Sequence, residues 1–177
     1  MASSFLDILQ QKIIVFDGAT GTHLQGQGLT PDDFGGEQLD GCNEILVVSK
    51  PQEVEKVHTD FLDAGCDVIE TNSFGGTRIV LAEYGLQDRA YELNFQAAQI
   101  AKRIARDYSG SGHPRFVAGS MGPTTKLPSL GHISFKEMAA AYQEQAKGLA
   151  EGGADLLCIE TCQDVLQTKA ALYGTFE

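Results

Sequence analysis

The sequence lacks several features that mark common classes of protein. No segment approaches 18 uninterrupted apolar residues, so we expect no transmembrane helix. Positive charge is scarce, because 13 Lys and Arg residues stand against 24 Asp and Glu residues and give a formal net charge of −11. This balance argues against nucleic acid and anionic membranes as partners. The N-terminal residues have neither a basic segment nor a long apolar one, which predicts a cytoplasmic protein without a secretory signal.

Cysteine pairs and common nucleotide-binding loops are also missing. The four cysteines include no Cys-x-x-Cys pair, so reduced thiols are expected. Cys66 and Cys158 lie beside or within expected strands, where a thiol acts as a small core residue. A metal site at Cys158 and Cys162 is the less favoured alternative. Neither GxxxxGK[ST] nor GxGxxG occurs, which argues against these two phosphate-binding loops.

Apolar runs alternate with helical patterns along the 177 residues, a length that suits one domain with a real core. Residues 67–72 read Asp-Val-Ile-Glu-Thr-Asn and follow a helical pattern that stops at Gly65. Residues 153–161 repeat this order of Gly, Asp, apolar run and Glu-Thr. A continuous apolar run between turn signals is typical of a strand that is buried on both faces of a parallel sheet.

The patterns predict four strands, each followed by helical segments. The strands are expected at 13–16, 67–71, 115–118 and 156–159. The helices are expected at 3–11, 49–65, 78–84, 88–108, 134–152 and 165–173, and an irregular loop is expected at 23–48. Ser49 with Gln52 and Ser134 with Glu137 have the spacing of capping boxes at helix starts.

Alternation of strands and helices predicts an α/β fold with parallel strands. Two architectures fit this order. One is a half barrel, the first four units of an eight-stranded TIM-type (β/α) barrel, and the other is a small open doubly wound sheet. A whole barrel would need about 300 residues or more at this unit length, so this chain is too short for one.

Polar or glycine-rich groups follow all four expected strands: Asp17-Gly18, Glu70-Thr71-Asn72, Gly119-Ser120 and Glu160-Thr161. The carboxyl ends of parallel strands meet at one face, where α/β folds bind their ligands. Carboxylates suit an ammonium group, whereas backbone N–H and hydroxyl groups suit a carboxylate, so an amino acid has the matching chemistry. Two alternatives stay open: the glutamates satisfy only backbone groups, or they serve as acid and base in an unrelated lyase.

Several motifs in order along the whole chain carry a resemblance. They are Phe16-Asp17-Gly18-Ala19-Thr20-Gly21-Thr22, Cys42-Asn43-Glu44, Ser49-Lys50-Pro51, Asp63-Ala64-Gly65, Asp67-Val68-Ile69-Glu70-Thr71-Asn72-Ser73-Phe74-Gly75 and Gly119-Ser120-Met121-Gly122-Pro123. The chain resembles the homocysteine S-methyltransferase family, which includes the homocysteine-binding domain of cobalamin-dependent methionine synthase and betaine–homocysteine methyltransferase. The resemblance implies a (β/α) barrel in which zinc binds the homocysteine sulfur and a methyl group is transferred to make methionine.

The resemblance also implies a homocysteine site at the strand ends. Its expected residues are Asp17, Gly18, Ala19, Thr71, Phe74, Ser120 and Glu160. The carboxylates of Asp17 and Glu160 would hold the amino group. The turn at 18–19 and Ser120 would lie near the other end of homocysteine, which is held by backbone groups rather than by these carboxylates. Thr71 and Phe74 would line the pocket, and no catalytic residue is assigned.

One departure from the family concerns the metal. The family binds zinc through three cysteines, one near strand six and an adjacent pair after a Gly-Gly at strand eight. None of the four cysteines here matches those positions, so no metal ligand is assigned. We therefore expect residues 1–177 to be the N-terminal part of the barrel domain, truncated after the fourth unit and inactive alone.

The expected partners follow from this interpretation. They are homocysteine, the remaining half of the barrel, and further modules that supply methyl groups through cobalamin and methyltetrahydrofolate. Unpaired strand edges also favour self-association. Two alternatives are a free-standing enzyme that uses betaine or S-methylmethionine and a non-catalytic fragment that binds an amino acid.

Overall fold

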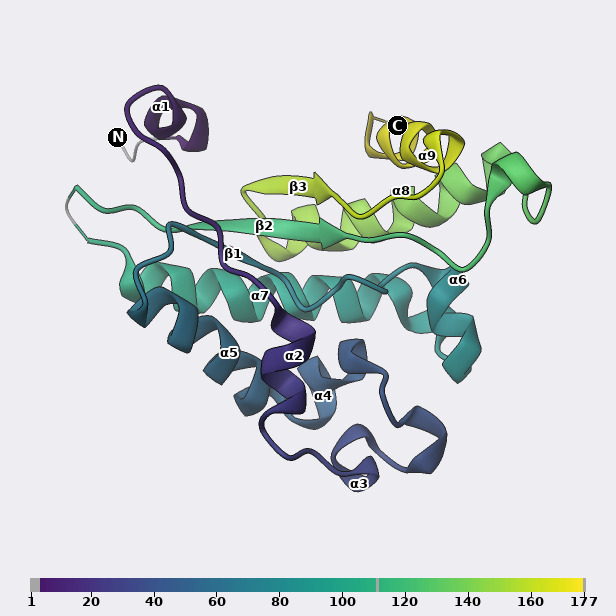
Figure 1. The fold of residues 1–177 in the computed structure, drawn as a ribbon, viewed down its shortest axis with the longest axis horizontal. Helices are drawn as coiled ribbons and strands as arrows, with labels where there is room; N and C mark the ends of the chain where they lie inside the picture. Colours follow the sequence, from purple (N-terminus) through teal and green to yellow (C-terminus); the bar gives the residue numbers. More distant parts are fainter. Residues whose placement is uncertain (1–3, 111, 177) are drawn as a thin grey trace.

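The computed structural model describes residues 4–110 and 112–176. Its sheet has three parallel strands, β1 (Val68–Glu70), β2 (Phe116–Met121) and β3 (Leu156–Ile159), in the order β1-β2-β3 (Figure 1). Phe16 forms a parallel bridge to Val68 on the other side of β1. The four segments thus lie side by side in chain order. This order is that of a barrel, whereas a doubly wound sheet reverses direction at a switch point.

The first expected strand, 13–16, is not a full strand. Its pairing includes the Phe16 bridge, with the N–H of Asp17 donating to the carbonyl of Val68 at 2.9 Å and the N–H of Asp67 donating to the carbonyl of Val15 at 2.7 Å. The segment has β1 on one side only, and Ile13 is 89% exposed. The prediction at 67–71 is one residue too long at each end. The prediction at 115–118 ends three residues early, and 156–159 is confirmed.

The helices agree with the expected ones except near the N-terminus. The α-helices are α1 (Phe5–Leu9), α2 (Thr20–Gln25), α3 (Pro31–Phe34), α4 (Leu46–Ser49), α5 (Pro51–Asp63), α6 (Arg78–Leu81), α7 (Ala90–Tyr108), α8 (Phe135–Gly152) and α9 (Val165–Phe176). Five 3-10 turns are η1 (Glu37–Leu39), η2 (Asn43–Ile45), η3 (Ala82–Tyr84), η4 (Gln87–Arg89) and η5 (Pro128–Leu130).

The expectation of an irregular loop at 23–48 is wrong, because this stretch holds several short helices. A reciprocal cap between Thr30 and Asp33 starts α3, and Gly35 ends it with a positive φ of 104°. Helices this short show no hydrophobic period that a sequence could reveal. The expected cap at Ser49 is also wrong, since its hydroxyl donates to the carbonyl of Ile45 and α5 begins after Lys50.

Helices α5, α7 and α8 cover one face of the sheet (Figure 1). The predicted capping box of Ser134 and Glu137 starts α8, and Gly153 ends it at a φ of +107°. Glycine lets α8 approach α7 closely, because a Cβ at Gly152 would lie 2.4 Å from the carbonyl oxygen of Phe95. This packing fixes the sheet, and with it the carboxyl ends of the strands.

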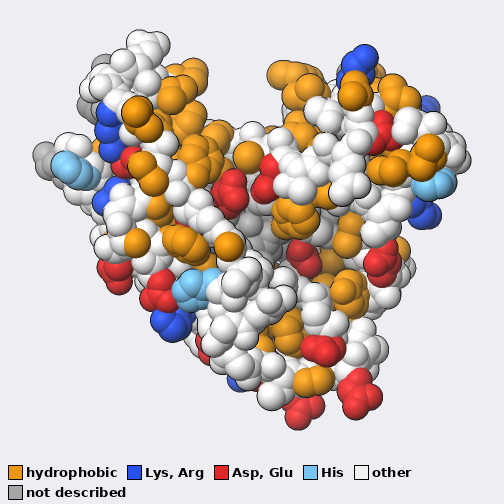
Figure 2. Space-filling model, viewed as in Figure 1, with side chains coloured by type: hydrophobic (Ala, Val, Ile, Leu, Met, Phe, Trp, Pro, Cys, Tyr) orange, Lys and Arg blue, Asp and Glu red, His pale blue; other side chains and the backbone are white. Residues whose placement is uncertain are grey.

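The opposite face of the sheet has a smaller cover. Val68, Phe116 and Ala118 form a cluster there, and Phe5 of α1 packs edge-on against Phe116 with ring centroids 5.5 Å apart. Figure 2 shows a hollow between the lobe that contains α1 and the lobe that contains α9, with apolar and acidic side chains around it. In a closed barrel this face would point to the interior.

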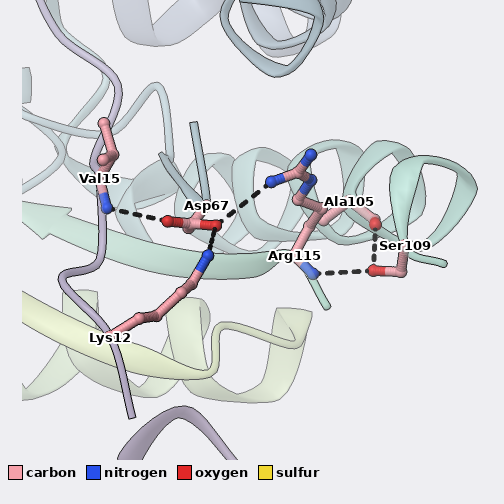
Figure 3. Close-up of polar contacts among 6 residues, drawn as sticks. All are labelled: Lys12, Val15, Asp67, Ala105, Ser109 and Arg115. Atoms are coloured by element: carbon pink, nitrogen blue, oxygen red, sulfur yellow. Dashed lines mark hydrogen bonds and ion pairs between the residues drawn. The ribbon is translucent and has the colours of Figure 1, made fainter. Parts of the chain in front are cut away.

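The repeated Gly-x-Asp pattern has a structural cause. The Asp67 carboxylate accepts hydrogen bonds from the N–H of Val15 at 3.0 Å and from Lys12 at 2.5 Å, and it also pairs with Arg115 (Figure 3). The Asp155 carboxylate likewise accepts from the N–H of Val117 at 2.9 Å and from Lys102 at 2.5 Å. Each aspartate thus attaches the start of its strand to the preceding segment. Within the described ranges, no helix is both long and apolar enough to cross a membrane.

Candidate functional site

A cavity of about 470 Å³ lies at the carboxyl ends of the strands. Six of the seven predicted site residues line it: Gly18, Ala19, Thr71, Phe74, Ser120 and Glu160. Larger hollows of about 980 and 800 Å³ lie on the outer helix surface and contain none of these residues. The cavity at the strand ends is therefore the candidate site, and the roles of its residues in binding homocysteine stay predictions.

Asp17, the seventh predicted residue, is not among the residues that line the cavity, although it directly precedes the lining residue Gly18. Its Oδ2 accepts a hydrogen bond of 2.9 Å from the N–H of Glu70, whereas its Oδ1 is buried without a partner among the described residues. Burial raises the pKa of Asp17 to about 7, and the charges of Glu70 and Glu160 add to the shift. Asp17 is thus a carboxyl group that titrates near neutral pH.

Glu160 is held at the end of β3 by two neighbours. The hydroxyl of Ser120 donates to Glu160 Oε1 at 2.6 Å, and the N–H of Glu160 donates to the carbonyl of Met121 at 3.2 Å. Thr161, the next residue, has a φ of +55°, which is uncommon for a residue with a branched side chain. This turn redirects the chain immediately after the carboxylate and leaves Glu160 at the cavity.

A third carboxyl group, that of Glu70, shares the cavity. Burial raises the pKa of Glu70, and the nearby charge of Glu160 raises it further. In the part of the chain that the structure describes, Asp17, Glu70 and Glu160 have no ion-pair partner. Burying carboxylates without a neutralising side chain costs free energy, which a cationic group of a ligand would offset.

Hydroxyl groups connect the ends of β1 and β2. Thr71 Oγ1 lies 2.5 Å from Ser73 Oγ and accepts from the N–H of Ser120 at 3.0 Å. Ser73 Oγ also donates to the carbonyl of Ser120 at 2.8 Å. These groups are buried and satisfy one another, so they hold the two strand ends in register.

The residues present do not match a three-cysteine zinc site. All four cysteines are free, and burial raises the pKa of each thiol, to about 11 for Cys42, Cys66 and Cys158. In the described part of the chain no three of these thiols come together, as a three-cysteine zinc site would require. Among the described residues, one group of three potential ligands comes together, Glu70, Cys158 and Glu160, whose atoms lie within 4.8 Å of one another.

Sequence reasoning assigned no homocysteine-binding role to several cavity residues, although it named Glu70 and Asn72 among the polar groups that follow the strands. Asn43, Glu44, Glu70, Asn72 and Ser73 also line the cavity. All five lie in motifs that carry the family resemblance, but a motif does not say which side chains turn inward.

Comparisons with known proteins identify the family of this chain. A family model described as homocysteine S-methyltransferase matches residues 14–176. The methionine synthases of Mycobacterium tuberculosis (strain ATCC 25618 / H37Rv) and Mycobacterium leprae (strain TN) are 46% and 45% identical over 173 residues. The match covers 98% of this chain and 14% of each relative, so the chain spans about one seventh of their length.

Solved structures show the same fold. The homocysteine methyltransferase MmuM from Escherichia coli, in its metallated form, matches with a TM-score of 0.75 and 25% identity over 92% of this chain and 59% of that one. Its apo form matches with a TM-score of 0.72 at 23% identity, which supports the fold alone. The barrel interpretation of the sequence is thereby confirmed in the form of a partial barrel. The chain belongs to the homocysteine S-methyltransferase family.

Proposed function

We propose that this chain is the homocysteine-binding part of a methyltransferase of the methionine synthase type, which methylates the homocysteine sulfur to give methionine. The carrying observation is the group of carboxyls around Asp17 and Glu160, which has no cationic partner among the described residues. The greater identity to methionine synthases, 46% against 25% for the E. coli homocysteine methyltransferase, supports this type. It disfavours the alternative of a free-standing enzyme that uses betaine or S-methylmethionine.

In this proposal the chain binds and orients the amino-acid end of homocysteine. The ammonium group would lie between Asp17 and Glu160, where its charge would compensate the cost of burying carboxylates. Ser120 would keep Glu160 in place through their 2.6 Å hydrogen bond. The α-carboxylate would accept from backbone N–H groups of the turn at 18–21, and Thr71 and Phe74 would form the walls.

Zinc and cobalamin belong to the same proposal but not to these residues. When bound, zinc would supply a lowered pKa for the substrate thiol. We place its ligands outside residues 1–177, because the described residues bring no three cysteines together. Cobalamin and methyltetrahydrofolate would be bound by other modules, which agrees with the 14% share of the relatives that the chain covers. Free cysteines agree with a cytoplasmic location.

We further propose that residues 1–177 are the N-terminal part of a barrel domain that needs the other half for methyl transfer. The chain covers 59% of the E. coli enzyme, so the match leaves a large part of that fold without a counterpart here. Ile13 beside the first edge and Val165 after β3 are 89% and 71% exposed. The other half, or a second copy of this chain, would cover such surfaces.

The proposal is tested by calorimetric titration of the purified chain with L-homocysteine and with 4-mercaptobutanoate, which lacks the amino group. We expect homocysteine to bind more tightly, and we expect Asp17→Ala and Glu160→Ala to remove most of that preference. Asp107→Ala is the matched control, because Asp107 is exposed and lies on α7 away from the cavity. Equal affinity of the unmodified chain for the two ligands would contradict the proposed ammonium site.

Homocysteine binding without methyl transfer would not separate a barrel half from a non-catalytic module. The second arm therefore mixes the chain with a separately produced C-terminal half of a related methionine synthase barrel and measures methionine formation. Activity that requires both halves supports the enzyme, whereas a mixture that associates and stays inactive with zinc and methyl donor favours the binding module.

A further inference from the structure

Glu44 is a buried carboxyl group for which the proposed binding of homocysteine has no use. It lies in η2 (Asn43–Ile45), is 9% exposed, and lines the cavity. Burial raises the pKa of Glu44, and no Lys or Arg pairs with it in the described part of the chain. A buried carboxyl without a cation costs stability, so packing alone does not account for its presence.

Glu44 and its neighbour Asn43 are hydrogen-bonded to the segment 72–75, here called the wall segment. Glu44 Oε1 accepts a hydrogen bond of 2.7 Å from the N–H of Gly75, at one end of the wall segment. At the other end, Asn72 Nδ2 donates to the carbonyl of Asn43 at 2.7 Å. Two consecutive residues, Asn43 and Glu44, therefore hold both ends of the segment that carries Phe74.

The wall segment is held from its other side by β2 and α8. The N–H of Gly122 donates to the carbonyl of Phe74 at 3.0 Å, and a Cβ at Gly122 would lie 2.7 Å from the Phe74 ring. Tyr142 donates to the carbonyl of Gly122 at 2.8 Å, and Gln145 donates to the carbonyl of Ser73 at 2.8 Å. The Phe74 ring thus packs against the backbone of Gly122, which has no side chain, and Phe74 stays 44% exposed at the cavity.

The fit between Glu44 and Gly75 depends on the length of the side chain. A Cβ at Gly75 would lie 2.9 Å from Glu44 Oε1, so the carboxyl oxygen occupies the space that a side chain would fill. An aspartate at position 44 is one methylene shorter and would leave the N–H of Gly75 without this acceptor. A glutamine keeps both the length and an acceptor oxygen.

We propose that Glu44 is a positioning residue that fixes Phe74 as a wall of the cavity through the N–H of Gly75. The consequence for homocysteine affinity rests on the proposed function, whereas the position of Phe74 does not. Loss of the acceptor frees one end of the wall segment while β2 and α8 still hold its other side. The ring would then move out of its place on Gly122.

The chain contains no tryptophan, so Phe74→Trp introduces a single fluorophore at the wall. In that background we compare Glu44→Ala, Glu44→Asp and Glu44→Gln with Glu37→Ala, an exposed glutamate of η1. We expect a red-shifted emission and stronger acrylamide quenching for Glu44→Ala and Glu44→Asp. Glu44→Gln and Glu37→Ala should keep the emission and the quenching of the Phe74→Trp protein. Melting temperatures are measured in parallel, because a purely structural role would lower them without this selectivity.

Homocysteine affinity is measured in the native Phe74 background and needs no reporter. Losing one hydrogen bond of this kind predicts about a tenfold rise in Kd for Glu44→Ala and Glu44→Asp, with rescue by Glu44→Gln. Unchanged emission and unchanged Kd in folded Glu44→Ala and Glu44→Asp would overturn the inference. If the unmodified chain binds no homocysteine, the proposed function fails, and the fluorescence series still decides the role of Glu44.

Discussion

The carboxylate of Asp17 accepts a hydrogen bond of 2.9 Å from the backbone N–H of Glu70. The bond joins the turn after the edge segment to the end of β1, and it sets the position of an acid whose pKa burial raises to about 7. A hydrogen bond to the ionised form lowers a pKa, so desolvation outweighs this contact. The same group should therefore affect stability near neutral pH and, in the proposed function, ligand binding.

Homocysteine affinity should depend on pH through Asp17. Below about pH 7 the free chain holds Asp17 protonated, and an ammonium ligand must displace that proton. We expect the association constant to rise about tenfold per pH unit up to pH 7 and to level off above it. Calorimetry between pH 5.5 and 8 in buffers of different ionisation enthalpy measures both the slope and the released proton.

Asp17→Asn is the matched variant, since it keeps the shape and an acceptor oxygen for the N–H of Glu70. It should bind weakly and lose the pH slope and the proton release near pH 7. A slope that persists in this variant would assign the titration to another group, of which Glu70 is the nearest candidate.

The same variant should be more stable than the parent at alkaline pH. The folded pKa of Asp17 lies above its usual value, so its ionisation disfavours the folded chain as the pH rises through about 7. By linkage, a pKa that moves from 3.8 to about 7 corresponds to roughly 4 kcal/mol at pH 8 as an upper bound. Urea unfolding of Asp17→Asn and parent at pH 5 and pH 8 should show a gain that grows with pH.

His58 should make the chain sensitive to acid. The side chain is fully buried in α5, neither ring nitrogen has a hydrogen-bond partner among the described residues, and burial lowers its pKa to about 4. Between pH 6.5 and pH 4 the unfolded chain binds a proton that the folded chain does not, so stability falls as the pH falls. From pH 7 to pH 5 the loss should be about 2 kcal/mol.

Comparison with His58→Leu isolates this contribution, because leucine removes the titrating ring and leaves an apolar side chain of similar volume. The free energy of unfolding of the parent minus that of the variant should decrease between pH 7 and pH 5, whatever the constant offset from packing. A difference that does not change with pH would show that His58 is protonated in the folded chain or hydrogen-bonded to water.

Much of the fold could be predicted because a local pattern coincides with a tertiary contact. The two Gly-x-Asp segments predicted buried strands, and in the structure Asp67 and Asp155 each accept from the backbone of the preceding segment. The run of four apolar residues at 13–16 predicts a strand by the same pattern, but the structure shows only partial pairing there. Whether such a run pairs over its whole length depends on tertiary contacts, which local sequence does not report.

The site could be located from the sequence but not completed. Polar residues after parallel strands must share one face, and the cavity lies there. Glu44 was missed because it lies in a 3-10 turn between short helices, and its contact with Gly75 spans 31 positions. Such contacts depend on the packing of η2 against the wall segment, and no periodicity in the sequence encodes it.

Gly152→Ala should strongly destabilise the contact between α7 and α8. The new methyl group would lie 2.4 Å from the carbonyl oxygen of Phe95 and 2.7 Å from the Cβ of Ala98, and backbone cannot turn away as a flexible side chain can. Overpacking of this kind costs about 1–3 kcal/mol, which exceeds the helix-propensity gain of alanine over glycine. Gly110→Ala is the control, because nothing lies within 4 Å of its added methyl group.

Self-association of the isolated chain should depend on its exposed apolar edges. Ile13, in the edge segment before β1, and Val165, at the start of α9, are 89% and 71% exposed. Light scattering after size exclusion should give a mass above the 19.0 kDa of one chain, and Ile13→Lys with Val165→Lys should return it to 19.0 kDa. Leu9→Lys is the matched control, because Leu9 of α1 is an apolar residue that is 50% exposed, and this variant should leave the mass unchanged. A monomeric parent at high concentration would mean that the net charge of −11 keeps the copies apart despite these edges.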